Sequence, residues 1–414
     1  MKGDNSKLLI YQALPRLYGN VSGKNLPGGS IEENGCGKMS HFTREKLDDL
    51  RELGFTHVWY TGILEHATTT SYPGIMHDHP DVVKGRAGSP YAIKDYYDVD
   101  PDLADDPKER REEFRQLVER THASGLGVII DFVPNHLARQ YQSDCSPQLE
   151  EDFGERDDRD MRFRRDNNFY YLTDQMLVIG SDYGPEPSAY SEYPARATGN
   201  DVFHAHPSRD DWYDTVKLNY GVDPDTGVGH FGEPVPDTWD KMYHILYHWA
   251  MQGVDGFRCD MAEMVPVPFW HWVIRRLHPD FPQLLFIGEI YQPWRYREHL
   301  DAGLDYLYDK VGLYDTLIGV LRGERAASDI TSVWQSQEGL SGRMLHFMEN
   351  HDEQRLASDF IVGTGAKGIP AVAVSALIDS GPMMIYFGQM LGEHGMDEEG
   401  FSGRNGRTTI YDYW

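Results

Sequence analysis

Short apolar runs rich in β-branched and aromatic residues recur along the 414-residue chain, and helical patterns lie between most of them. The clearest runs are LLIYQAL (8–14), FTHVWYTGI (55–63) and LGVIIDFVPNH (126–136), and TREKLDDLRELG (43–54) predicts a helix that ends at a Gly. Nearly continuous apolar strands that alternate with helices indicate a parallel sheet covered on both faces. Five further strands are predicted at 253–260, 284–290, 303–308, 344–350 and 382–388.

Eight strands of this kind predict an α/β fold, a closed (β/α)8 TIM barrel with its site at the C-terminal ends of the strands. A doubly wound open sheet is the alternative, but no GxGxxG follows the first strand. The helix predicted before the third strand places four side chains on one face: Phe114, Leu117, Val118 and Thr121. Asp106, which precedes Pro107, is its predicted N-cap.

One interval breaks this alternation. Residues 137–232 are polar, rich in Asp, Arg, Tyr and Pro, and show little helical periodicity. A loop of this length within a compact fold indicates a small domain or lid. We therefore expect three parts: 1–136 with strands one to three of the barrel, 137–232 as an inserted domain, and 233–414 with strands four to eight.

Charge and composition exclude several partner classes. The net charge of −27 argues against nucleic acid and anionic membranes, since both require a basic surface. The 25 Tyr and nine Trp suit ligands with apolar faces and hydroxyl rims, such as sugars. The three cysteines, Cys36, Cys145 and Cys259, lack a CxxC pair and predict neither a disulfide framework nor a zinc site.

The N-terminus and the hydropathy pattern bear on location. MKGDNSKLLIYQ lacks the apolar core of a signal peptide, and no run of 18 apolar residues occurs. A cytoplasmic location is the default expectation, with export the alternative if a signal has been removed. The sequence does not indicate an oligomeric state.

Acidic residues stand at the ends of four predicted strands, namely Asp131, Asp260, Glu289 and Asp352. Strand alternation points Arg258 and Asp260 to the same side, although a buried ion pair seldom adds much stability. A magnesium site is one interpretation, but phosphoryl chemistry would normally bring a Gly-rich phosphate loop or a Lys cluster. Glycoside hydrolysis instead needs one ionised carboxylate and one protonated carboxyl group.

The motifs around these acids resemble, in order, the conserved regions of the α-amylase family, family 13 of the glycoside hydrolases. DFVPNH is similar to the first region, GFRCDMAEM to the second, GEI to the third and FMENHD to the fourth. KLNY (217–220) resembles an extra region near the end of the family's inserted domain, and SPYAIKDYYDVDP (89–101) a segment that supplies a stacking tyrosine. The resemblance covers essentially the whole chain and implies a barrel with an inserted domain.

The resemblance implies specific catalytic roles. Asp260 would be the nucleophile that forms a glycosyl-enzyme, Glu289 the general acid/base, and Asp352 the residue that holds the sugar hydroxyls and stabilises the transition state. Arg258, which is also a predicted substrate-binding residue, should lower the pKa of Asp260, while an apolar setting should keep Glu289 protonated.

Further roles concern the sugar and a metal. His136 and His351 would hydrogen-bond the sugar at the cleavage point, and Tyr91 would stack beneath it. Asn135 would bind a structural Ca²⁺, or a ligand of that ion, where the inserted domain joins the barrel. Asp131 would have a supporting role.

The sequence departs from typical α-amylases after the nucleophile. Glu263 and Met264 stand where a Lys and a His contact the leaving-group side of the glucan, so Glu263 is a predicted substrate-binding residue. Arg355 is another, because some oligosaccharide-acting relatives have a similarly placed Arg, with a salt bridge as its alternative role. The usual C-terminal β domain and final barrel helix are not evident after the eighth strand, so we expect the second barrel part to be truncated.

We therefore predict a retaining hydrolase of α-1,4 bonds in starch-derived glucans or maltooligosaccharides. The alternatives are a transglycosylase, a neopullulanase or α-glucosidase activity, and a sugar isomerase with the same intermediate. A non-catalytic carbohydrate-binding relative is a third class, which loss of one of the three acids would have favoured.

Overall fold

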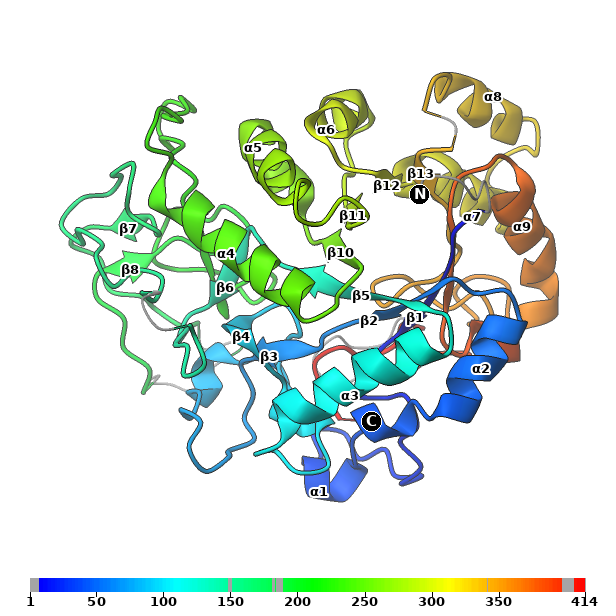
Figure 1. Cartoon of the computed structure of the whole chain (residues 1–414), viewed down its shortest axis with the longest axis horizontal. Helices are drawn as coiled ribbons and strands as arrows, with labels where there is room; N and C mark the ends of the chain where they lie inside the picture. Colours follow the sequence, from blue (N-terminus) through cyan, green and yellow to red (C-terminus); the bar gives the residue numbers. More distant parts are fainter. Residues whose placement is uncertain are drawn as a thin grey trace.

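The computed structural model describes residues 7–147, 151–180, 183, 189–340, 342–396 and 406–413. Eight parallel strands form one sheet in the order β13-β12-β11-β10-β5-β2-β1-β14 (Figure 1). An isolated parallel bridge between His346 and Met383 joins the two ends of that order and nearly closes the barrel. The strands are β1 (Leu9–Ala13), β2 (His57–Tyr60), β5 (Gly127–Phe132), β10 (Gly256–Cys259), β11 (Leu285–Gly288), β12 (Tyr306–Tyr308), β13 (Met344–Leu345) and β14 (Met383–Tyr386). Each lies within a predicted strand, so the barrel prediction is confirmed.

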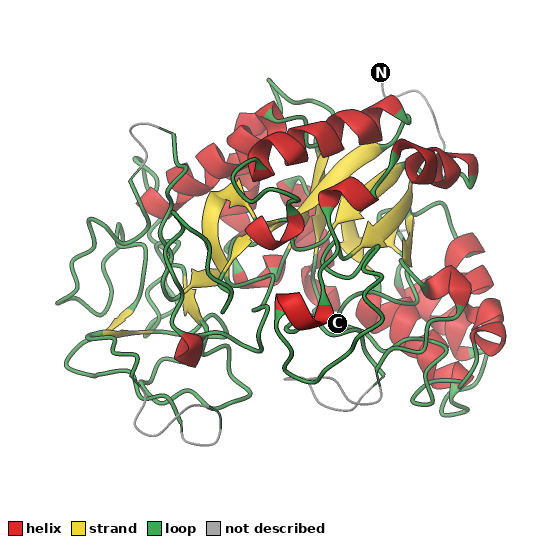
Figure 2. Ribbon diagram, turned by 90° about the horizontal axis from the view of Figure 1, so that it is seen from below, coloured by secondary structure: helices red, strands yellow, loops and turns green. Residues whose placement is uncertain are grey.

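Helices lie around the outside of this sheet (Figure 2). They are α1 (Ile31–Asn34), α2 (Arg44–Glu52), α3 (Arg110–Ala123), α4 (Asp237–Met251), α5 (Val267–Leu277), α6 (Tyr296–Ala302), α7 (Asp315–Leu321), α8 (Asp329–Ser336) and α9 (Gly365–Leu377). The four side chains predicted for one face of α3 are all buried. The predicted N-cap was wrong, because α3 begins at Arg110 and the carboxylate of Asp106 accepts the N–H of Lys108 in a preceding turn.

Small antiparallel sheets interrupt the barrel. Between β5 and α4, β6 (His136–Ala138) pairs with β9 (Thr215–Lys217), and β7 (Tyr171–Leu172) pairs with β8 (Ala195–Arg196). Figure 1 shows that this segment forms a lobe at one side of the barrel. A third sheet, β3 (Leu64–His66) with β4 (Ile93–Val99), was not expected, because a long loop separates its two strands along the chain.

The end of the described chain returns to the barrel. In the described residues after β14, the helical structure is a single 3-10 turn, Gln389–Leu391. Residues 406–413 then pack against the loops after β1 and β2, where Arg16 donates to the carbonyl of Ile410 at 2.9 Å. Trp414 lies outside the described residues. Within the part of the chain described here, no helix has both the length and the apolar character needed to cross a lipid bilayer.

Candidate active site

One buried guanidinium organises the acids at the strand ends. Arg258 is only 1% exposed, and its Nη1 lies 2.7 Å from Oδ1 of Asp260. Its Nη2 lies 2.8 Å from Oε2 of Glu289, which follows β11. A third carboxylate, that of Asp131 on β5, lies 3.5 Å from Nη1. Parallel strands deliver their C-terminal residues to one edge, so acids far apart in sequence meet on a single cation.

Aromatic rings enclose this guanidinium. Its central carbon lies 5.5 Å from the Trp59 ring centroid, 5.3 Å from that of Tyr91 and 5.5 Å from that of Tyr308. The predicted substrate contact of Arg258 stays a prediction. The side chain is covered, and its contacts are with carboxylates and rings within the barrel.

A cleft of about 240 Å³ lies above these groups. The three predicted catalytic acids line it together with His136 and Tyr91. Several other lining residues were not predicted, among them Trp212 from the inserted segment, whose ring centroid lies 5.0 Å from that of His136, and Ile410 with its neighbour Tyr411 near the end of the sequence. Single residues in irregular segments carry no periodic signal, so the sequence could not have identified them.

Burial changes the protonation of Asp260. Its removal from water, together with the negative charge of Glu289, raises the pKa of Asp260 well above the usual range, although the attraction of Arg258 lowers it. The expected lowering by Arg258 is thus outweighed by burial. The carboxylates of Glu289 and Asp131, which lie beside the same guanidinium, act with burial against the attraction of Arg258.

Asp352 has the opposite behaviour. Burial alone would raise its pKa, but the neighbouring His351 imidazole lowers the pKa of Asp352 to about 2. His351 Nε2 lies 3.0 Å from Oδ2 of Asp352, whose side chain is 37% exposed. His351 itself is buried, stacks on Tyr91 with ring centroids 5.3 Å apart, and contacts the Gln12 amide at 2.8 Å. His351 thus contacts two residues that line the cleft, Tyr91 and Asp352.

The surroundings of Glu289 are polar, contrary to the apolar setting that was expected. Oε2 accepts the backbone N–H of Met261 at 2.8 Å in addition to its contact with Arg258. Oε1 lies 2.5 Å from the hydroxyl of Tyr291, which also lines the cleft.

Glu263 and Met264 lie beside the cleft on a separate groove of about 590 Å³ between the inserted segment and the β10–α5 loop. The Glu263 Oε2 atom accepts the backbone N–H groups of Tyr291 and Gln292, each at 3.1 Å. The predicted role of Glu263 in binding sugar hydroxyls therefore competes with a hydrogen-bonding role within the protein.

Arg355 is not among the residues that line the cleft, and its predicted substrate contact stays a prediction. The side chain is 1% exposed, and its Nη1 lies 2.8 Å from Oε2 of Glu349 and 2.8 Å from the carbonyl of Phe387. The alternative role, a salt bridge to a neighbouring acid, describes its surroundings.

The residues around Asn135 do not fit a calcium ion. The Nζ atom of Lys217 contacts Oδ1 of Asn135, the oxygen that would face the ion, and lies 2.9 Å from Oδ1 of Asp201. The Asn135 amide nitrogen donates to the carbonyl of Gly199 at 2.8 Å. Calcium needs six to eight oxygen ligands, whereas here a protein ammonium takes the central place.

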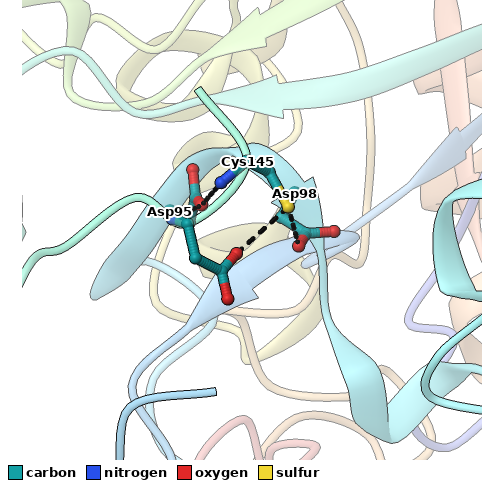
Figure 3. Close-up of side chains that lie close together, drawn as sticks. Asp95, Asp98 and Cys145 are labelled. Atoms are coloured by element: carbon teal, nitrogen blue, oxygen red, sulfur yellow. Dashed lines mark hydrogen bonds between the residues drawn. The ribbon is translucent and has the colours of Figure 1, made fainter. Parts of the chain in front are cut away.

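Acidic side chains also gather away from the cleft, at β4 and the start of the inserted segment (Figure 3). Potential ligand atoms of Asp95, Asp98, Asp144 and Cys145 lie within 4.8 Å of one another, so the group could hold a metal ion. Arg110 forms a two-point ion pair with Asp98, one point of which is 3.0 Å long. The thiol of Cys145 donates to the same carboxylate at 2.8 Å.

Asp95 in this group accepts hydrogen bonds from Ser143 Oγ at 2.8 Å and from the backbone N–H groups of Asp144 and Cys145. These donors and Arg110 already satisfy much of the group without an ion.

Comparisons with known proteins identify the family. The profile of the α-amylase catalytic domain matches residues 30–284. Among curated relatives, neopullulanase 2 of Thermoactinomyces vulgaris is 22% identical over 404 residues, covering 94% of this chain and 57% of the relative. The intracellular maltogenic amylase of Bacillus subtilis is also 22% identical, covering 94% and 56%. The chain thus spans little more than half the length of these relatives.

Among solved structures, an α-amylase from Lactobacillus plantarum aligns with a TM-score of 0.61 at 21% identity, over 99% of this chain and 75% of that one. The γ-CGTase of alkalophilic Bacillus clarkii aligns with a TM-score of 0.63 at 19% identity, over 98% and 55%. At these identities the structural likeness supports the fold. Because the catalytic-domain profile covers more than half of the 414 residues, we conclude that the chain belongs to the α-amylase family of glycoside hydrolases.

Proposed function

We propose that this chain cleaves α-1,4-glucosidic bonds of starch-derived glucans or maltooligosaccharides with retention of configuration. Asp260 is the nucleophile, Glu289 the general acid/base, and Asp352 the residue that holds the sugar hydroxyls. The observation that carries the proposal is the convergence of these three acids on one cleft, where two of them contact the same guanidinium. Such a compact pair suits direct attack, whereas inversion needs room for a water molecule.

The chemistry proceeds in two displacements. Asp260 attacks the anomeric carbon while Glu289 gives its proton to the leaving oxygen, so one C–O bond forms as the other breaks. Water then attacks the same carbon and returns a proton to Glu289, and Asp260 is released. Before reaction, the Asp260–Glu289 pair must hold one proton between them. The raised pKa of Asp260 supports that count, and the bound sugar must direct the proton to Glu289.

Asp352 enters this scheme as a permanent anion. Its low pKa, about 2, supports its assignment to the positive charge that develops on the sugar ring. Tyr91 and His136, both on the cleft wall, are the groups we assign to sugar stacking and hydroxyl contact. We further propose that 137–232 works as an inserted domain that borders the cleft, between barrel parts 1–136 and 233–414.

Chain-length preference follows from the leaving-group side. Met264 offers only apolar contact, and the carboxylate of Glu263 is already engaged by two backbone N–H groups. We therefore propose a preference for short maltooligosaccharides over long glucans. The names of the two curated relatives, a neopullulanase and a maltogenic amylase, favour this direction and keep cleavage of pullulan as the second candidate.

The test combines one variant with product analysis. Asp260→Asn should abolish turnover and leave the thermal unfolding curve close to that of the unchanged protein. Proton NMR of maltoheptaose hydrolysis should show the α-anomer first, and pullulan and isomaltose should identify the linkage. Initial release of the β-anomer, or full activity in the variant, would refute the mechanism.

A further inference from the structure

The two oxygens of Glu289 have different partners. Oε2 faces the guanidinium of Arg258 and the backbone N–H of Met261, both at 2.8 Å. These groups can only donate, so Oε2 has to remain an acceptor. The proton that Glu289 carries as an acid therefore belongs on Oε1, whose partner is the Tyr291 hydroxyl at 2.5 Å.

A hydroxyl differs from both partners of Oε2 because it can donate or accept. Burial, with the charge of Glu289 as the next cause, raises the pKa of Tyr291 well above its ordinary value, so the phenol stays protonated in both states of Glu289. When Glu289 is a carboxylate, Tyr291 donates to Oε1. When Oε1 carries a proton, the O–H group of Glu289 can donate a hydrogen bond to the phenol oxygen.

Tyr291 is itself held in place by Glu263, which lies in the turn after β10. Its backbone N–H and that of Gln292 both donate to Oε2 of Glu263, which ties the loop after β11 to the turn after β10. Arg295, from the same loop, donates to the carbonyl of Glu263 at 2.5 Å. The contacts join two loops that carry the nucleophile and the acid.

We propose that Tyr291 is a positioning residue whose hydrogen bond to Oε1 of Glu289 reverses direction in each half of the reaction, and that Glu263 fixes the loop that carries it. The inference deepens the proposed function and rests on it. In the first half, the Oε1 proton passes to the leaving oxygen as that C–O bond breaks, and Tyr291 then donates to the new carboxylate. In the second, Oε1 takes a proton from the attacking water, and the phenol oxygen accepts again.

The test separates steps that need the acid from those that do not. Fluoride leaves without a proton, so kcat/KM for α-maltosyl fluoride reports attack by Asp260 alone. Tyr291→Phe should lower kcat/KM for maltopentaose by about 10- to 100-fold, within the range for general acid catalysis, and that for the fluoride by less than about threefold. Tyr60→Phe, which removes a buried hydroxyl contact of 2.7 Å to Thr121 on α3, is the matched control and should change neither.

Glu263 supplies the rescue experiment. Glu263→Ala should show the Tyr291→Phe pattern, whereas Glu263→Gln keeps an oxygen that accepts both N–H groups and should retain most of the activity. Equal loss on both substrates, or no rescue by Gln, would refute the positioning role.

Glu289→Gln distinguishes a failure of the proposed function from a failure of the inference about Tyr291. It should lose activity on maltopentaose and keep attack on the fluoride. If it does not, the proposed acid is wrong. If it does while Tyr291→Phe changes neither substrate, the proposed function stands and the inference about Tyr291 falls.

Discussion

The buried Glu65, next to the acidic group drawn in Figure 3, gives a quantitative prediction for how protein stability depends on pH. Glu65 lies on β3 in register with Asp95 on β4, and the residue is only 2% exposed. Among the described residues, its Oε2 has no hydrogen-bond partner. Burial, followed by the charges of Asp98 and Asp95, raises the pKa of Glu65 from 4.5 to about 9. The folded protein thus keeps a proton that the unfolded chain releases above pH 4.5.

The sign and size of the effect follow from that difference. Between pH 4.5 and 9 the native state binds one more proton than the unfolded state, so the free energy of unfolding falls as pH rises, by about 1.4 kcal/mol per pH unit. Glu65→Gln removes the titrating group and keeps its shape. The variant should be more stable than the unchanged protein, with a gap that widens by about 1–2 °C in Tm per pH unit at this chain length.

Thermal unfolding from pH 5 to 8.5, with and without a chelator, measures this gap. Glu192→Gln is the matched control, because the ion pairs of Glu192 with Arg139 and Arg196 outweigh burial and lower the pKa of Glu192 to about 2. It should reduce Tm by a constant amount over this range. Parallel curves for Glu65→Gln would refute the reasoning. A loss of stability on the same substitution, reproduced by chelation, would show that the group holds a metal ion.

Two further outcomes are expected. Lys217→Met should lower the free energy of unfolding by about 2 kcal/mol, because the Asn135 oxygen loses its donor while the half-exposed Asp201 recovers water. Chelation should leave Tm unchanged. A fall in Tm on chelation would instead indicate a metal at the junction with the inserted segment. Arg355→Met should lower the free energy of unfolding by about 3–5 kcal/mol, because it leaves Glu349 buried and unpaired. The folded fraction should give unchanged products. Altered products would place Arg355 at the substrate.

The barrel and the acids were predictable for one physical reason. Strands buried on both faces are continuously apolar, and the polar residues that end them lie at the same edge of the sheet. Asp260 and Glu289 could therefore be placed together from the sequence, and Arg258 beside Asp260 from strand alternation. The family resemblance supplied roles that spacing alone does not give.

Other features depend on partners that are distant in sequence. The place of Lys217 beside Asn135 joins residues 82 positions apart, and the contact of Glu263 with Tyr291 spans 28. Neither pair has a periodic pattern. The direction of the pKa shift of Asp260 could not be predicted from Arg258 alone, because burial and the charges of Glu289 and Asp131 oppose its attraction.

Three groups of oxygen atoms in the described residues share one feature. Where carboxylates or amide oxygens converge in this acidic chain, a protein cation is already among them: Arg258 in the cleft, Lys217 at the junction with the inserted segment, and Arg110 beside β4. A chelator cannot remove an arginine or lysine side chain, and such a side chain fixes the geometry of its partners as the chain folds. In the cleft, Arg258 contacts both Asp260 and Glu289, while burial raises the pKa of Asp260 well above its usual range. A retaining glycosidase needs one proton on this pair of carboxyl groups, and the raised pKa of Asp260 supports the proposed chemistry in that respect.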